Sequence, residues 1–185
     1  GPAGVTITLE GEEVNITPDL YEMREEVVEV PGEDVVPHVI EPSYGIDRMI
    51  YAVLEHGYDE EMVEGEERRV LRLIPRIAPV QAAVFPLMNR DGLPEMAMEI
   101  ASTLRARGLV AEYDDSGAIG RRYRRQDEAG TPFAITVDYQ SREDRTVTLR
   151  DRDSMRQVRV PIEGIPGLLC SLVEGSRTFA DLPPA

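Results

Sequence analysis

A short segment near residue 40 carries three side chains that could bind a small polar substrate. A strand would deliver Glu41 and Ser43, Gly45 permits a tight turn, and Arg48 follows in the first turn of a helix. A carboxylate pairs with an ammonium group, and a guanidinium binds phosphate through paired hydrogen bonds. The pattern therefore indicates a site for an amino group and a phosphate. A structural strand–turn–helix with an Arg ion pair explains the same residues equally well.

A second candidate is the basic run GRRYRR at residues 120–125, in which four arginines surround Tyr123. Arginine binds phosphate through two parallel hydrogen bonds and stacks on bases, and tyrosine offers a further stacking surface. The run therefore has the composition of a single-stranded RNA contact. The alternative is a solvated helix face paired with neighbouring acidic residues. In the segment RDRDSMR at 150–156, positively and negatively charged residues alternate, which by itself predicts weak surface ion pairs.

The first candidate site needs strands and a helix to position it. Residues 5–9, 14–16, 23–30 and 35–40 combine β-branched and polar residues, which predicts strands of an antiparallel sheet. From Ile46 to His56 the apolar residues recur with the 3.6-residue period of a helix. The acid-rich run at 59–67 offers little to bury and predicts a solvated linker.

The basic run lies in a part of the chain where predicted strands and helices alternate. Strands are expected at 80–87, 109–113, 133–138, 146–149 and 158–161, and helices at 93–107, 120–128 and 165–173. Gly108 stands where a left-handed helix cap belongs. This order predicts an α/β domain with a largely parallel or mixed sheet.

Charge is distributed unequally along the 185 residues. All 20 basic residues are Arg, and the net charge is −15. Residues 1–68 hold 19 acidic residues and three Arg, whereas residues 69–185 hold 16 acidic residues and 17 Arg. We therefore expect two domains, 1–68 and 69–185, with any polyanion bound by the second. The composition, 42% hydrophobic and 30% charged, excludes low-complexity and wholly disordered classes.

Cysteine and histidine are scarce, which limits redox and metal chemistry. One Cys and two His cannot form an intramolecular disulfide or a usual four-ligand zinc site, so no metal site is predicted.

No apolar run of about 18 residues is present, so we expect no membrane partner and a reducing, cytoplasmic location. The Gly117–Gly120 segment lacks the Lys-Ser/Thr of a phosphate loop.

The segment from Pro37 to Arg48 resembles the third signature motif of the archaeal and eukaryotic type of glycyl-tRNA synthetase. Further matches to that family follow in the same order and spacing, and the similarity runs from about Gly4 to Leu182. The matching segments are residues 78–79, 84–87, 114–117, 120–123, 127–128 and 148–157. Several motifs in order are more specific than any single one.

The resemblance implies a class II enzyme that activates glycine with ATP and Mg²⁺, ligates it to tRNA(Gly) and works as a homodimer. The implied fold is α/β, a partial antiparallel catalytic sheet followed by an anticodon-binding domain with a mixed sheet flanked by helices. Arg48 would be the catalytic arginine that contacts the ATP γ-phosphate. Glu41 and Ser43 would line the glycine pocket, with Glu41 facing the amino group.

The resemblance also favours RNA contact for both basic segments, at the RNA-facing end of the sheet. The implied tRNA-binding residues are Arg121, Arg122, Tyr123, Arg125, Arg150 and Arg152. The family's first two motifs would lie upstream of Gly1, so we expect this chain alone to be inactive and to hold no bound cofactor.

Two rival functions remain. The chain could be a stand-alone anticodon-binding paralogue, acting as a non-catalytic accessory or RNA-binding module, although such a protein has little need of Glu41, Ser43 and Arg48. An acidic protein-interaction scaffold would explain the net charge but not the arginine-rich second half.

Overall fold

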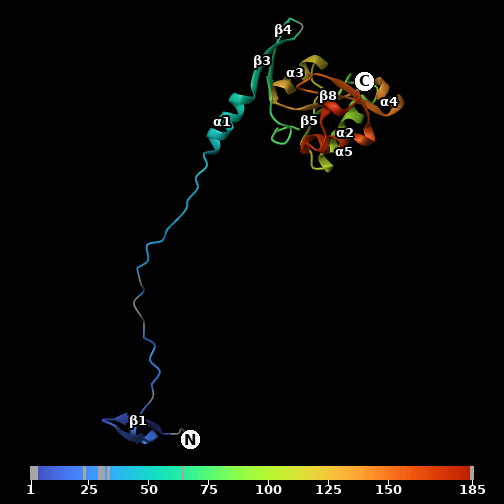
Figure 1. Cartoon of the computed structure of the whole chain (residues 1–185). Coiled ribbons are helices and arrows are strands. Elements are labelled where there is room, and N and C mark those ends of the chain that lie inside the picture. The colour runs from blue at the N-terminus through green and yellow to red at the C-terminus, as the bar shows by residue number, and fades with distance from the viewer. Residues whose placement is uncertain (1–3, 23, 29–31, 33, 64, 184–185) are drawn as a thin grey trace. The chain divides into compact units, whose positions relative to one another are not determined.

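The computed structural model describes residues 4–22, 24–28, 32, 34–63 and 65–183. The chain divides into two compact units, Gly1–Ser43 and Tyr44–Ala185 (Figure 1). The boundary predicted after Arg68 falls inside strand β4 (Glu66–Leu71).

The first unit contains one antiparallel hairpin. Strands β1 (Val5–Leu9) and β2 (Glu12–Ile16) pair from Val5 opposite Ile16 to Leu9 opposite Glu12. Glu10 and Gly11, both with positive φ, make a two-residue turn of the kind that suits a hairpin. A 3-10 turn, η1 (Pro18–Leu20), follows.

The strands predicted at 23–30 and 35–40 do not form in the described residues, so this prediction is wrong there. Positions 23, 29 and 30 lie outside the described residues. Val27, Val35 and Ile40 are 90%, 75% and 96% exposed. A strand needs a neighbouring strand for its hydrogen bonds, and within this unit β1 and β2 pair with each other.

The second unit begins with the predicted helix, α1 (Ile46–Gly57), which leads directly into β3 (Tyr58–Val63). Strands β3 and β4 pair antiparallel, so the linker predicted at 59–67 is wrong: the segment is a hairpin. Opposite charges across the pair explain why an acidic run forms a strand. Glu60 faces Arg69 and Glu61 faces Arg68.

A five-stranded mixed sheet forms the centre of the second unit, as predicted. Its strands are β5 (Ala82–Pro86), β6 (Ala111–Tyr113), β7 (Phe133–Val137), β8 (Thr146–Asp151) and β9 (Gln157–Pro161). Their order is β6-β5-β7-β8-β9, with β5 parallel to both neighbours and the last two pairs antiparallel. Strands β5 and β7 are buried on both faces and read as continuous apolar runs.

Helices cover both faces of this sheet (Figure 1). Helices α2 (Leu93–Ala106) and α5 (Ile165–Glu174) contribute to the large apolar core on one face. Helix α3 (Ile119–Ala129) packs on the other face, where Tyr123 meets Phe85 edge to face at 5.4 Å between ring centres. Short elements α4 (Tyr139–Asp144), η2 (Ile162–Gly164) and η3 (Phe179–Asp181) complete the unit.

The winding of the chain reverses at β5. The loop that leaves β5 runs to α2 on one face, and the loop that leaves β6 runs to α3 on the other. Ligands of open α/β sheets bind where such loops diverge, beyond the carboxyl ends of the strands. A hydrogen bond of 2.9 Å from Asn89 Nδ2 to the Asp115 carbonyl oxygen ties the two loops together.

Candidate nucleic-acid interface

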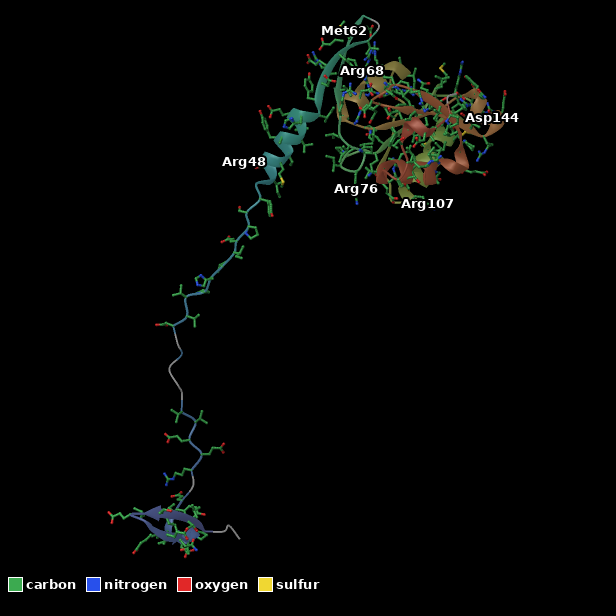
Figure 2. The ribbon with its side chains drawn as sticks, viewed as in Figure 1. Arg48, Met62, Arg68, Arg76, Arg107 and Asp144 are labelled. Carbon is green, nitrogen blue, oxygen red and sulfur yellow. The ribbon has the colours of Figure 1, made fainter. Side chains whose placement is uncertain are left out.

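The three residues of the first candidate site belong to two different units. Glu41 and Ser43 are exposed, lie in the first unit and belong to no strand, contrary to prediction. Arg48 is exposed in the first turn of α1, in the second unit, as Figure 2 shows. Their assignment to a site for ATP and glycine therefore stays a prediction.

Arg122 is buried and joins two loops instead of facing solvent. Only 3% of the residue is exposed. Its guanidinium donates to the carbonyl oxygens of Pro86, Asp115 and Gly117, the last two at 2.9 and 2.8 Å. This side chain holds the end of β5 against the start of α3, so its first role is structural.

Arg150 and Arg152 are also buried, at 7% and 2% exposed. Arg150 binds the Asp127 carboxylate at 2.9 and 3.2 Å and lies over the Tyr123 ring, 4.8 Å from its centre. Arg152 donates to the Gly130 carbonyl at 2.8 Å and to the Leu73 carbonyl at 2.9 Å. Buried charges need such partners, so both arginines stabilise the fold.

Asp127 is the centre of a buried charge network that sequence reasoning missed. Arg68 on β4 donates from Nε to Asp127 Oδ2 at 2.9 Å and from Nη2 to the Arg152 carbonyl at 2.7 Å, and its side chain is fully buried. Arg68 also pairs with Glu61 on β3. The network fastens the β3–β4 hairpin to α3 and β8. In the sequence, Arg68 cannot be told from an exposed strand arginine.

A close backbone approach reinforces this junction. Gly130 ends α3 with φ +84, and a Cβ atom there would lie 2.9 Å from Leu73 Cδ1 and 3.2 Å from the Leu71 carbonyl oxygen. Only glycine combines the positive φ with this contact. The hairpin and the sheet therefore meet through charge, hydrogen bonds from arginine side chains to backbone carbonyls, and packing.

Several exposed cations lie at the carboxyl end of the sheet. Arg121 is exposed in the first turn of α3. The Arg125 side chain is 45% exposed and donates to the carbonyl oxygen of Ser116 at 2.8 Å and to Asp114. Arg90, in the loop after β5, has a side chain 66% exposed and was not predicted. Tyr123 is half-buried and its hydroxyl lies 2.6 Å from Thr136 Oγ1.

Three groups at this end of the sheet have displaced pKa values. Burial and a hydrogen bond to Asp115 raise the pKa of Tyr113 to about 12. Although burial raises it, the pKa of Asp114 lies below its ordinary value because Arg125 and Ser116 donate to the carboxylate. The Arg159 guanidinium lowers the pKa of Asp138. Both carboxylates are therefore ionised at neutral pH, with their charges balanced by arginines.

Residues 81–171 match the family model described as "Anticodon binding domain". The chain is 50% identical over 177 residues to the glycine–tRNA ligase of Archaeoglobus fulgidus and 51% identical over 177 residues to that of Methanothrix thermoacetophila. Each match covers 96% of this chain and 31% of the relative. The chain is related to glycine–tRNA ligases. It spans about a third of the length of these curated relatives.

Solved structures show the same fold. Two structures of prolyl-tRNA synthetase from Cryptosporidium parvum, one with halofuginone and AMPPNP and one with L-proline and AMP, match 57% of this chain with TM-scores of 0.53 and 0.54. The match covers 23% and 24% of those chains at 24% identity, so the likeness is one of fold. The predicted resemblance and the predicted mixed sheet flanked by helices are confirmed.

The second unit therefore carries a synthetase-type anticodon-binding fold, with cations exposed on α3 and on the loop after β5. In the described part of the chain, no three Asp, Glu, His or Cys residues are grouped to hold a metal ion. No helix formed by those residues has the length and apolarity to span a bilayer.

Proposed function

We propose that this chain is the C-terminal, tRNA-recognising part of a glycyl-tRNA synthetase, an enzyme that activates glycine with ATP and ligates it to tRNA(Gly) in the cytoplasm. The observation that carries the proposal is identity of 50% over 96% of the chain to a glycine–tRNA ligase. The anticodon-binding domain match over residues 81–171 supports it independently.

The contribution of this chain would be RNA binding by the second unit. Arg121 and Arg125 stay in the proposed tRNA contact because both are exposed, and Arg90 joins them. Arg122, Arg150 and Arg152 would act indirectly, by holding the loops and α3 that present those cations. Tyr123, packed under Arg150, would support the same surface.

The catalytic contribution would be partial. Arg48 would contact the ATP γ-phosphate, and Glu41 and Ser43 would line the glycine pocket once the rest of the enzyme orders them. ATP, Mg²⁺ and the homodimer interface would depend mainly on the part of the enzyme that this chain does not include. The exposed apolar face of α1, with Met49 and Ile50 at 50% and 53% exposed, would pack against that part.

A binding assay tests the RNA function directly. Labelled glycine tRNA and the same tRNA with an altered anticodon are titrated with the chain across a range of salt concentrations. We expect tighter binding to the unaltered tRNA and a linear fall of log affinity with log salt, since phosphate contacts release counterions. Equal affinity for both RNAs would reduce the function to general polyanion binding.

A non-catalytic accessory module is the second candidate, because Glu41, Ser43 and Arg48 are all exposed. Glycine-dependent pyrophosphate exchange discriminates the two within the longer protein. Loss of exchange on Arg48→Ala there would support the catalytic assignment. Unchanged exchange would favour the accessory role. The 185-residue chain alone should show none.

A further inference from the structure

The last residue of helix α1 is held tightly against the β3–β4 hairpin. Helix α1 leads into β3 without a loop, since it ends at Gly57 and Tyr58 begins the strand (Figure 1). The backbone N–H of Arg72, which follows β4, donates to the Gly57 carbonyl oxygen at 2.5 Å. A Cβ atom added at Gly57 would lie 3.3 Å from Leu71 Cδ1. The direction of α1 therefore follows that of the hairpin.

The side chain of Arg72 connects this junction to the sheet. Nε donates to Asp59 Oδ2 at 2.9 Å and Nη2 to Glu61 Oε2 at 3.1 Å, both on β3. Nη1 donates to Asp153 Oδ1 at 3.1 Å, in the turn between β8 and β9. Although burial raises it, the pKa of Asp153 lies below its ordinary value because Arg152 and Arg72 donate to the carboxylate. A single exposed ion pair contributes little, but a guanidinium that binds three carboxylates restrains the elements that carry them.

The position of Arg48 is sensitive to the direction of α1. Arg48 precedes Gly57 by nine residues on the same helix. A rise of about 1.5 Å per residue separates these residues by about 13 Å along the axis, so a tilt of about 10° at the junction would move Arg48 by about 2 Å. Misplacement by about 1 Å at a reacting centre can lower a rate by about a hundredfold.

We propose that Arg72 is a positioning residue for the ATP site: by binding carboxylates on β3 and on the β8–β9 turn, it sets the direction of α1 and thereby the place of the Arg48 guanidinium. The inference rests on the proposed function, in which Arg48 contacts ATP. The buried pair of Arg68 and Asp127 holds the same hairpin, but its loss should destabilise the whole unit. The Arg72 side chain is 32% exposed, so there position can be separated from stability.

Arg69 on β4 provides a matched control. Its side chain lies 3.7 Å from Glu60 and 2.9 Å from Glu67, and both partners belong to the hairpin itself. Arg72→Met and Arg69→Met each remove a cation and keep an apolar side chain of similar length. The first substitution also removes a contact with the β8–β9 turn.

The test uses the longer ligase, whose glycine-dependent pyrophosphate exchange is measured with ATP and glycine varied separately. We expect Arg72→Met to raise the KM for ATP by about tenfold. The KM for glycine should stay unchanged, because Glu41 and Ser43 belong to the other unit. Arg69→Met should match wild type, and Arg72→Lys should restore part of the loss. Partial unfolding would lower the apparent kcat and leave both KM values unchanged.

A double-mutant cycle tests whether Arg72 acts through Arg48. The Kd for ATP is measured by calorimetry for Arg48→Ala, Arg72→Met and the double variant of the longer ligase. Arg72→Met should have little further effect once Arg48 is absent, because coupled residues are not additive. In the 185-residue chain, residual dipolar couplings measure the angle between α1 and β5. This angle should change in Arg72→Met and not in Arg69→Met.

Different results would overturn the two proposals separately. If Arg48→Ala leaves both ATP binding and exchange unchanged, the catalytic part of the proposed function fails, and the positioning role fails with it. If Arg48→Ala weakens ATP binding but Arg72→Met behaves like Arg69→Met, the positioning role alone is wrong. Additive effects of Arg48→Ala and Arg72→Met would also refute it, since Arg72 would then act on ATP binding by another route.

Discussion

Arg68 donates a hydrogen bond of 2.9 Å to Asp127, and both side chains are buried. The two residues are 59 positions apart, one on β4 and the other on α3. Because α1 runs into β3 and β3 pairs with β4, this contact fastens the segment that follows Arg48 to the anticodon-binding fold. The second unit therefore includes the hairpin as part of its structure.

Replacing Asp127 should destabilise the second unit strongly. Asp127→Asn leaves the buried guanidinium groups of Arg68 and Arg150 without their shared counter-charge. We expect the free energy of unfolding to fall by about 3 kcal/mol, measured by urea titration with circular dichroism. Glu128→Gln, exposed at the next position of α3, is the control and should change stability little. A loss for Asp127→Asn as small as that of the control would refute the structural role.

Substitutions of the neighbours Arg121 and Arg122 should have different effects, the first on RNA binding and the second on stability. Arg121→Ala removes an exposed cation, so we expect weaker tRNA binding, a salt slope lower by about 0.7 to 0.9 and an unchanged free energy of unfolding. Arg122→Ala leaves three carbonyl oxygens without their donor and should cost about 2 kcal/mol of stability. Salt-titrated binding and urea unfolding of both variants are the measurements. Identical effects of the two substitutions would contradict the assignment.

Periodicity was enough to predict most of the second unit. The spacing of Leu93, Met96, Ile100 and Leu104 predicts helix α2. Met96 is half-buried and the other three are buried. Gly108 has φ +84, as its place after the helix predicts. Strands β5 and β7 were visible as short apolar runs. These signals are local, and the folded structure agrees with them.

The predictions that were wrong concern segments whose structure depends on contacts with residues distant in the sequence. The β3–β4 hairpin was missed because its acidic strand is matched by arginines across the pair, and pairing is not visible in one strand alone. The expected strand at 35–40 has the right composition but no neighbouring strand. Likewise, the sequence shows that Arg122 and Arg150 are basic, but their burial depends on the packing of distant loops, so their roles could not be separated from that of Arg121.

Stability should depend on the ionisation of Asp138. Hydrogen bonds from Arg159 hold the pKa of this carboxyl below its ordinary value of 3.8 against the effect of burial, and Ser141 contributes. The native state is therefore favoured while Asp138 is charged, fully above about pH 4, and loses this contribution as pH falls through the lowered pKa. Asp138→Asn should be less stable than wild type near neutral pH, and the difference should shrink in acid.

Urea titrations of both proteins between about pH 7 and pH 3 measure this difference. Asparagine retains an acceptor for the cap of α4, so the comparison isolates the charge. Glu143→Gln, exposed on the same short helix, serves as the control and should match wild type at each pH. A constant difference between Asp138→Asn and wild type across the range would show that the charge is not responsible.

The apolar face of α1 should be available to a probe in this chain and covered in the longer enzyme. Ile50 and Met49 border an apolar hollow of about 390 Å³ with Leu73 and Ile77. Because Ile50 is 53% exposed, Ile50→Glu should change the stability of the isolated chain by less than about 0.5 kcal/mol. It should also lower the fluorescence of the apolar dye ANS.

The same substitution should lower the melting temperature of the longer ligase, because a carboxylate would then be buried where α1 packs against the catalytic part. His56→Glu, an exposed change near the end of the same helix, should leave both measurements unaltered. An unchanged melting temperature for Ile50→Glu in the longer protein would mean that the face stays open there. The packing proposed for α1 would then be wrong, and its apolar residues would have to serve another contact.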